Sequence, residues 1–377
     1  MSKTILFLTT AHEPLDDRIF YHQAHSLVRD GFSAVIVSTA FSLQETRDSI
    51  IIDAEQVNET MTIRQKLAFI RSKLDRYKPD LVICSEPLPV YCAKKYARKN
   101  PAKVVYDITE WYPSRKHFTN IRGYKRRLRF WKLLLFNLYV GFAADGFIFG
   151  EACKRLPFRV LFPFKQQISL PYYPHADYIK VRPKVFDPTN ITLCYAGRIS
   201  EEKGTSNFLH AIAFFRQCYP QIKVNVKIIG KPESRDEELK FIHLQSFLNV
   251  GELKIITPVD LPCFSEALAD VDICFDLRKD DLENQMSLPI KIFYYAACGK
   301  PVIYSKLWAI RRSVEWTKFG QLVNPKDYKQ ITNCITSYIE NPALYEQHSR
   351  SGRELFAAKY NWELIEAGFK SFVRSFL

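Results

Sequence analysis

Short apolar runs alternate with helix-length amphipathic segments along the whole chain of 377 residues. A run bounded by polar or turn residues predicts a buried strand, and apolar residues that recur every three or four positions predict a helix. In the first half, this pattern predicts strands at 4–9, 33–38, 78–85, 145–149 and 159–162, and helices at 19–30, 90–99 and 122–143.

The second half repeats the alternation. Strands are predicted at 191–195, 223–229, 253–256, 273–276, 301–304 and 320–323, and helices at 206–218, 328–339, 345–359 and at the C-terminus; one more helix starts at Pro289 and ends before Gly299. Strands that alternate with helices predict parallel sheets covered by helices, which is the α/β class.

Two domains are predicted, because 377 residues exceed the usual size of one domain. Residues 163–189 contain five prolines and little periodicity, so the linker falls there. The predicted boundaries are an N-terminal Rossmann-like domain at 1–170, a linker at 171–189, a second Rossmann-like domain at 190–355, and a final segment at 356–377 whose helix crosses back to the first domain.

The most informative stretch is 191–205, ITLCYAGRISEEKGT, which reads as strand, tight turn and helix. Gly197 permits the turn and the close approach of a ligand, and the N–H groups at the start of the helix attract an anion. Arg198 offers a planar fork and Lys203 a point charge, shapes that suit a diphosphate. The alternative is a basic loop whose charges are simply solvated.

Polar residues also follow the predicted strands of the first domain. His12, Asp16 and Arg18 lie in the loop after the first strand, where ligands bind in open α/β sheets, although Asp16 or Asp17 could instead cap the following helix. Thr109 and Glu110 follow the apolar residues of KVVYDITEWYP, and Glu110 could equally be a carboxylate at a helix start.

Two further segments of the second domain are candidates for contacts with a bound ligand. Gly230 ends the predicted strand 223–229 at a sheet edge. In SLPIKIFYYAACGKPVIYS, Pro289 suits the first helical position, and the N–H groups of Ile290 and Lys291 could meet an oxyanion. The alternative function of this helix is packing alone.

The net charge limits the classes of partner, and the cysteine pattern indicates the redox compartment. The net charge of +14 indicates an anionic partner, which is a nucleic acid, an anionic membrane or a phosphorylated substrate. No nucleic-acid-binding module is recognisable, so nucleic acid is not expected. The nine cysteines lack metal or redox spacing and no apolar signal precedes the first strand, so we expect reduced thiols in a cytoplasmic protein.

The charge is concentrated between Ser114 and Ala144, where eight Lys and Arg occur without an acidic residue and are interleaved with aromatic and aliphatic side chains. The apolar part is too short for a transmembrane helix. Either residues 115–139 lie on the anionic inner face of a membrane, as a peripheral contact, or the apolar residues join the core while the basic turns stay solvated.

GRISEEKG resembles the G-R-x4-K-G element of the family 4 glycosyltransferases, and the resemblance extends from about Thr4 to about Phe372 through an H-x-x-x-D-x-R-I-F start, the SLPIKIFYYAACGKPVI segment and a YNW-E ending. It implies a GT-B fold, in which two Rossmann-like domains face each other across a cleft. It also implies retaining transfer of a sugar from a nucleotide-sugar donor, without a metal or other cofactor.

The resemblance assigns residues to roles. Arg198 and Lys203 would hold the diphosphate and act in catalysis; the donor would be bound by Gly197, Gly230, Ser287, Pro289, Ile290, Lys291 and Tyr294; and His12, Arg18, Thr109 and Glu110 would lie at the acceptor or cleft side. The implied acceptor is a glycan or a lipid-linked molecule, in cell-surface polysaccharide or glycolipid synthesis.

Three positions depart from the family pattern. Thr109 stands where the family often has a His beside the transferred sugar, and Met286 and Tyr294 stand where many members carry two Glu. A Tyr hydroxyl can still bond a ribose hydroxyl, and Glu283 lies near enough in sequence to substitute. These departures leave a second hypothesis open, a catalytically impaired protein that binds a nucleotide sugar or a partner enzyme.

Overall fold

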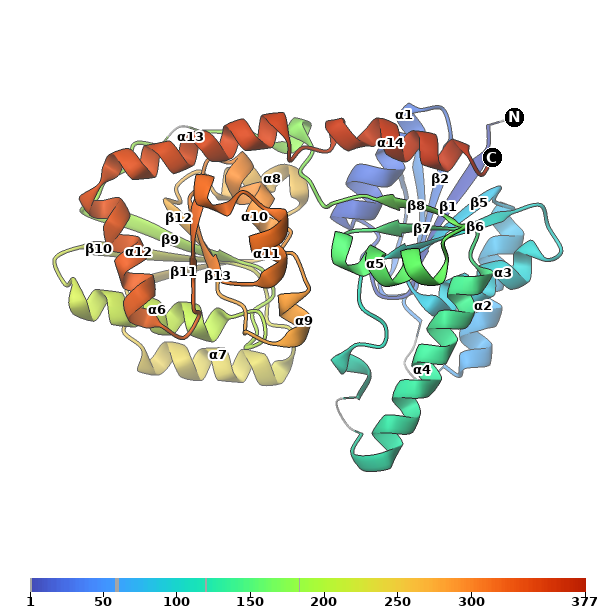
Figure 1. The fold of residues 1–377 in the computed structure, drawn as a ribbon, viewed down its shortest axis with the longest axis horizontal. Coiled ribbons are helices and arrows are strands. Elements are labelled where there is room, and N and C mark those ends of the chain that lie inside the picture. The colour runs from blue at the N-terminus through green and yellow to red at the C-terminus, as the bar shows by residue number, and fades with distance from the viewer. Residues whose placement is uncertain (1, 58–60, 119–120, 183) are drawn as a thin grey trace. The chain divides into compact units, whose positions relative to one another are not determined.

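The computed structural model describes residues 2–57, 61–118, 121–182 and 184–377, and it divides into two compact units (Figure 1). Unit 1 comprises residues 1–172 and 365–377, and unit 2 comprises residues 173–364. The chain therefore enters unit 2 between Tyr172 and Tyr173 and leaves it between Leu364 and Ile365. Of the expected linker 171–189, residue 183 lies outside the described residues, as do 119 and 120 within the basic run.

Unit 1 is built on an eight-stranded sheet in the order β3-β4-β2-β1-β5-β6-β7-β8. The strands pair in parallel except β3, which runs antiparallel to β4. Their central residues are apolar on both faces, as expected for parallel strands covered by helices. The strands are β1 (Thr4–Thr9), β2 (Ser33–Ser38), β3 (Leu43–Arg47), β4 (Ile50–Ala54), β5 (Leu81–Cys84), β6 (Lys103–Ile108), β7 (Gly146–Phe149) and β8 (Gln166–Ser169).

The helices of unit 1 differ from the sequence prediction in two places. The predicted helix 19–30 is a π-helix, η1 (Asp17–Ala24), continued by α1 (His25–Arg29). The predicted strand 159–162 is wrong, because these residues end a helix; a four-residue apolar run cannot by itself distinguish the two. The other helices are α2 (Ile63–Tyr77), α3 (Pro87–Ala97), η2 (Arg115–Phe118), α4 (Gly123–Ala143), α5 (Ala152–Leu161) and α14 (Glu363–Arg374).

Strands β3, β4, β6 and β8 and helices α2 and α5 were not predicted. For α2 the signal was present, since Thr62 and Gln65 form a capping box at its start. Strands β3 and β8 are partly exposed and carry polar residues, so they lack the apolar run that marks a buried strand.

Unit 2 contains a six-stranded, fully parallel sheet in the order β11-β10-β9-β12-β13-β14. Its core is formed by apolar side chains of β9, β10 and β12 packed against α6 and α12. The strands are β9 (Asn190–Ala196), β10 (Lys223–Ile229), β11 (Glu252–Ile256), β12 (Ile273–Asp276), β13 (Val302–Ser305) and β14 (Gly320–Val323).

Two helix starts in unit 2 differ from the prediction by two or more residues, and one of them is that of the helix predicted at 345–359, which begins at Pro342. The helix expected from Pro289 begins at Lys291, with Ile290 as its N-cap, so Pro289 precedes the helix instead of occupying its first position. The helices are η3 (Ala176–Tyr178), α6 (Thr205–Cys218), α7 (Arg235–Phe247), α8 (Leu261–Ala267), α9 (Leu282–Gln285), α10 (Lys291–Ala297), α11 (Trp308–Ser313), η4 (Trp316–Lys318), α12 (Tyr328–Glu340) and α13 (Pro342–Ala358).

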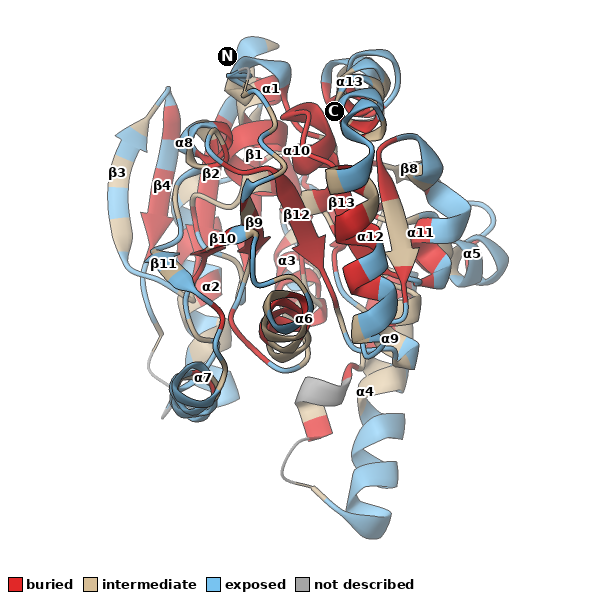
Figure 2. Cartoon of the chain, turned by 90° about the vertical axis from the view of Figure 1, so that its left-hand side faces the viewer, coloured by how far each residue is buried: buried red, intermediate tan, exposed pale blue. Residues whose placement is uncertain are grey.

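Burial separates the two halves of α4. Figure 2 shows the central strands in red and the N-terminal half of α4 in pale blue. The C-terminal half packs on unit 1 through Asn137 and Val140, and Asn137 accepts a hydrogen bond from the Tyr106 hydroxyl at 3.2 Å. Residues 122–132 are exposed on all sides. Core packing and solvated basic turns thus occur at opposite ends of one helix.

Gly204 occupies a position in unit 2 that has no room for a side chain. It has φ +84°, and a Cβ there would lie 1.9 Å from the carbonyl oxygen of Leu277; Gly31 has φ +87° but no atom within 4 Å of such a Cβ. We expect Gly31→Ala to cost about 1 kcal/mol and Gly204→Ala about 3 kcal/mol, because only the second adds a clash to the backbone strain. Urea unfolding of each variant, followed through the transition of its own unit, measures both; equal costs would contradict the steric argument.

Candidate functional site

The carboxyl edge of the unit 2 sheet contains a topological switch point. From β9 the chain proceeds outward to β10 and β11, then returns to β12 on the other side of β9. The loops that follow β9 and β12 therefore leave the sheet in opposite directions, which is where open α/β sheets bind ligands. Residues 197–204 and 277–290 form these two loops.

Glycines bring three backbone segments into contact at this edge. A Cβ on Gly230 would lie 1.8 Å from the carbonyl oxygen of Gly197, so β10 and the β9 loop meet backbone to backbone. Gly204 makes the corresponding contact with Leu277 after β12. A Cβ built on Gly197 would lie 3.5 Å from Nζ of Lys291, which places the amine of Lys291 beside the Gly197 turn.

Arg198 and Lys203 both lie in the loop before α6, where each pairs with an acidic side chain. Nη1 of Arg198 is 3.5 Å from Oε1 of Glu233, and the Arg198 side chain is 60% exposed. Nζ of Lys203 is 2.8 Å from Oε1 of Glu202. Such exposed pairs contribute little stability, so an anion of higher charge can displace either carboxylate at small cost.

Tyr195 holds the backbone of the loop that carries these cations. The Tyr195 hydroxyl is 2.7 Å from the carbonyl oxygen of Arg198, to which it donates, and 3.3 Å from that of Lys203. Burial raises the pKa of Tyr195, so its hydroxyl stays a donor at physiological pH. The backbone of the loop is therefore fixed, while the Arg198 side chain extends into solvent and that of Lys203 is partly exposed.

A further arginine at this edge was missed by the sequence analysis. Nε of Arg278, directly after β12, donates to Asp276 at 2.9 Å, and the side chain is largely buried. Burial alone would lower the pKa of Arg278, but the adjacent Asp276 carboxylate raises it, so the guanidinium remains charged. Its place after a strand at the switch point was the signal that could have revealed it.

The other predicted donor residues surround the start of α10. Ser287 donates its hydroxyl to the carbonyl oxygen of Glu283 at 2.8 Å, and Pro289 is buried just before the helix. Tyr294 is 3% exposed, and its ring meets that of Phe264 edge to face at a centroid distance of 5.8 Å. Tyr294 thus packs in the interior of unit 2, whereas Lys291 reaches the Gly197 turn.

Unit 1 has its own switch point, between β1 and β5. Glu86, which follows β5, accepts hydrogen bonds from the Thr9 hydroxyl at 2.9 Å and the Thr10 N–H at 2.8 Å. Nε2 of His12 is 3.3 Å from Oγ1 of Thr109 and 3.8 Å from Oε1 of Glu86. The structure therefore brings His12 and Thr109 together and adds Glu86, which the sequence analysis did not name as a site residue.

His12 is held as a cation. Its Nδ1 lies 3.3 Å from Oδ2 of Asp16. Burial alone would lower the pKa of His12, but the carboxylates of Asp16, Glu86 and Glu110 outweigh it and raise the pKa to about 9. An imidazolium can only donate hydrogen bonds, so hydrogen bonds from a polyhydroxylated ligand would be accepted by the neighbouring carboxylates and by the Thr109 hydroxyl.

Arg18 is placed differently from the other predicted residues of the first domain. Its guanidinium is 3% exposed and binds Asp107 through two hydrogen bonds of 2.8 Å, while Nη1 donates to the carbonyl oxygen of Leu170 at 2.7 Å. The ring of Tyr172 covers it at 4.5 Å. Three of its five N–H donors are used within unit 1 and the side chain is almost inaccessible to solvent, so Arg18 supports the loop that carries His12 and does not face a substrate.

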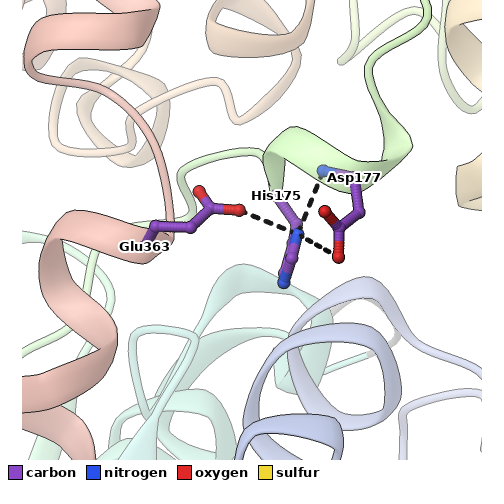
Figure 3. Close-up of side chains that lie close together, drawn as sticks. All are labelled: His175, Asp177 and Glu363. Carbon is purple, nitrogen blue, oxygen red and sulfur yellow. Dashed lines mark hydrogen bonds and ion pairs between the residues drawn. The ribbon is translucent and has the colours of Figure 1, made fainter.

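One set of side chains among the described residues has metal-ligand chemistry. Potential ligand atoms of His175, Asp177 and Glu363 lie within 4.8 Å of one another (Figure 3). Nδ1 of His175 is 2.9 Å from Oε1 of Glu363, which also accepts the N–H of Ala176 at 2.9 Å, and Nδ1 accepts the N–H of Asp177 at 3.2 Å. These hydrogen bonds, with Trp362 N–H to Pro174, tie residues 174–177 to 361–363.

The sequence of the cation-bearing unit identifies its family. Residues 190–341 match the family described as glycosyl transferases group 1. This segment belongs to that family. A phosphatidyl-myo-inositol mannosyltransferase of Mycobacterium leprae is 24% identical over 175 residues, which are 46% of this chain and 44% of the relative. The chain thus matches less than half the length of that relative.

Solved structures extend the likeness to both units. A sucrose-phosphate synthase from Thermosynechococcus elongatus aligns over 99% of each chain with a TM-score of 0.77 and 15% identity. Anabaena Alr3699/HepE, solved in complex with UDP-glucose, aligns over 99% of each chain with a TM-score of 0.76 and 17% identity. The fold is therefore that of GT-B glycosyltransferases, which confirms the predicted fold class.

The group 1 segment contains the switch point with the cations Arg198 and Lys203. His12, Glu86 and Thr109 lie outside it, in unit 1. Sequence reasoning could have found Glu86, because it directly follows the apolar run LVICS at the same edge as His12. The positions of Glu86 and His12 in the sequence did not show that these residues would lie close together. The strands that precede them, β5 and β1, are far apart in the sequence and become neighbours in the sheet.

The charge state of His12 is measurable. NMR titration of the imidazole should give a pKa of about 9, and Asp16→Asn should lower it toward the ordinary value of about 6.5. Because the folded-state pKa is raised, the stability that His12 contributes is complete below about pH 6.5 and is lost as the pH rises through about 9. The His12 resonances are assigned by their loss in His12→Gln, and a pKa near 6.5 in the wild type would refute the imidazolium.

Proposed function

We propose that this chain is a retaining glycosyltransferase that moves a sugar from a nucleotide-sugar donor to a glycan or lipid-linked acceptor, in cell-surface polysaccharide or glycolipid synthesis. The observation that carries the proposal is the carboxyl edge of the group 1 segment, where Arg198 and Lys203 lie in one loop and the amine of Lys291 lies beside Gly197, which has no side chain. A diphosphate fits such an edge because it needs cations and close backbone approach together.

The chemistry follows from where charge develops. When the anomeric carbon–oxygen bond breaks, the leaving nucleoside diphosphate keeps the electron pair and gains negative charge. Arg198, Lys203 and Lys291 are positioned to stabilise that charge, and the N–H groups at the start of α6 add to the field. These interactions strengthen as the bond breaks, so they lower the barrier more than they tighten donor binding.

Unit 1 supplies the acceptor side in this proposal. His12, Thr109 and Glu110 would contact acceptor hydroxyls, and Glu86 would position His12. The hydrogen bond between His12 and Thr109 puts an imidazole next to the position where the family often has its own His. That contact favours an active enzyme over the impaired binding protein, because the missing imidazole has a neighbour that can replace it.

A lipid-linked acceptor is supported by two observations. The similar mycobacterial protein is named for a phosphatidylinositol substrate. In this chain, the basic residues of 122–132 are exposed on α4 and meet no acidic side chain within their own segment. We propose an anionic membrane surface as the partner of residues 115–139, of which 119 and 120 lie outside the described residues.

Arg198→Ala and Lys203→Ala should each reduce kcat for donor turnover about 100-fold with a smaller change in KM, since each removes a charge needed mainly in the transition state. The assay follows sugar release or transfer over a panel of nucleotide sugars. Lys240→Ala is the matched control, because Lys240 is an exposed lysine that also pairs with a single glutamate, at 2.9 Å. Donor binding without turnover for every donor would instead support the binding-protein hypothesis.

Metal removal should leave the reaction intact. Side-chain cations provide the charge in this proposal, so turnover in EDTA should stay within about twofold of turnover in Mg²⁺. Exchanging Mg²⁺ for EDTA should also leave the unfolding midpoint of the protein unchanged, because the potential ligand atoms of His175 and Glu363 already accept backbone hydrogen bonds. Loss of turnover in EDTA that added Mg²⁺ restores would overturn the metal-independent scheme.

A further inference from the structure

An exposed apolar stripe runs the full length of α4. Its six members follow one another at intervals of four, three, four, four and three residues, which places them on one face of the helix. All are between 47% and 74% exposed. The stripe, called the α4 stripe below, consists of Tyr124, Leu128, Trp131, Leu135, Tyr139 and Phe142.

The α4 stripe is not the face that packs on unit 1. That face carries Phe136, Asn137 and Val140, and the ring of Phe136 meets that of Tyr91 on α3 at 5.9 Å. In the C-terminal half of the helix, the exposed residues are Leu135, Tyr139 and Phe142, and of these Tyr139 also approaches Tyr91, at a centroid distance of 6.3 Å. The helix therefore has two apolar sides. One, in its C-terminal half, packs on the core of unit 1, and the other, the α4 stripe, is exposed and longer.

A second exposed apolar surface lies on the elements that pack against the C-terminal end of α4. On α5 and the turn after it, Leu156, Val160, Leu161 and Phe164 are 50–100% exposed, with Phe164 exposed completely. The rings of Phe142 and Phe162 meet edge to face at 4.9 Å, and Nζ of Lys165 donates to the carbonyl oxygen of Gly141 at 2.9 Å. The two helices thus hold their exposed apolar residues on joined elements of unit 1.

Charge decides which partner fits. Lys125, Arg127 and Lys132 flank the α4 stripe, and the segment from Ser114 to Ala144 has no acidic residue. Although the stripe has the spacing of a coiled-coil seam, two copies would bring like charges together along both flanks. An anionic bilayer instead accepts the apolar residues and attracts each nearby Lys or Arg by about 1 kcal/mol.

We infer that the α4 stripe and the exposed apolar face of α5 form one docking surface that inserts into the headgroup region of an anionic phospholipid membrane. No helix among the described residues is long and apolar enough to cross a bilayer. The inserted part is therefore the stripe itself, with α4 lying along the surface. The inference rests on the proposed function for its purpose, delivery of a lipid-linked acceptor, but its test needs no sugar donor.

The test is co-sedimentation of the full chain with phosphatidylcholine vesicles, with and without phosphatidylglycerol. The wild type should bind only vesicles that contain phosphatidylglycerol, and Leu135→Ser or Phe164→Ser should weaken binding about tenfold, because each removes a large side chain from the apolar contact. Phe247→Ser is the matched control, since Phe247 is 75% exposed on α7 of unit 2. Unchanged unfolding midpoints show that the variants fold.

Several outcomes would overturn the inference: equal binding by the stripe variants, no binding by the wild type, or a wild-type dimer that Leu135→Ser converts to a monomer. Displacement from vesicles by an oligonucleotide would favour nucleic acid on the basic flanks. Donor hydrolysis without vesicles separates this inference from the proposed function, because it should be the same in the wild type and in Leu135→Ser. A chain that binds vesicles but turns over no donor would refute only the proposed function.

Discussion

Close backbone contact at the carboxyl ends of β9, β10 and β12 is the constraint on which the rest of unit 2 depends. A Cβ at Gly230 or Gly204 would overlap a carbonyl oxygen at less than 2 Å, so these loops can pack as they do only because the side chains are absent. The contact draws the loops after β9 and β12 together at the switch point. It also leaves a surface of peptide groups that a phosphate can approach closely, while the cations stand around it on longer side chains.

Unit 1 reaches a comparable result through buried charge. Arg18 and Asp107 are almost fully buried as a pair. Burying either charge without its partner would cost several kcal/mol. Through its hydrogen bonds to Asp107 and to the carbonyl oxygen of Leu170, Arg18 fixes the loop after β1. His12 and Glu86 can then face each other across adjacent strands as groups whose charge states are set by that fixed neighbourhood.

The two units also differ in what they show to solvent. In unit 2, Arg198 and Lys203 lie in one loop and pair with acidic side chains, an arrangement that suits a site which exchanges small anions. In unit 1 the cations are spread along a helix and alternate with large apolar side chains, a distribution that suits an extended surface instead of a pocket. Proposed donor chemistry and proposed membrane contact are therefore carried by separate parts of the chain.

The sequence by itself determined the fold class, most strands, and the loop that carries Arg198 and Lys203, because those depend on local signals: apolar runs, a turn glycine and charges placed directly after a strand. It also delimited α4 to within a residue. Only the tertiary structure decided that Arg18 is a buried support, that Glu86 meets His12, that Lys291 reaches Gly197, and that residues 159–162 end a helix. Each of these depends on which strands become neighbours or on which face of a helix finds the core, and sequence spacing does not record either.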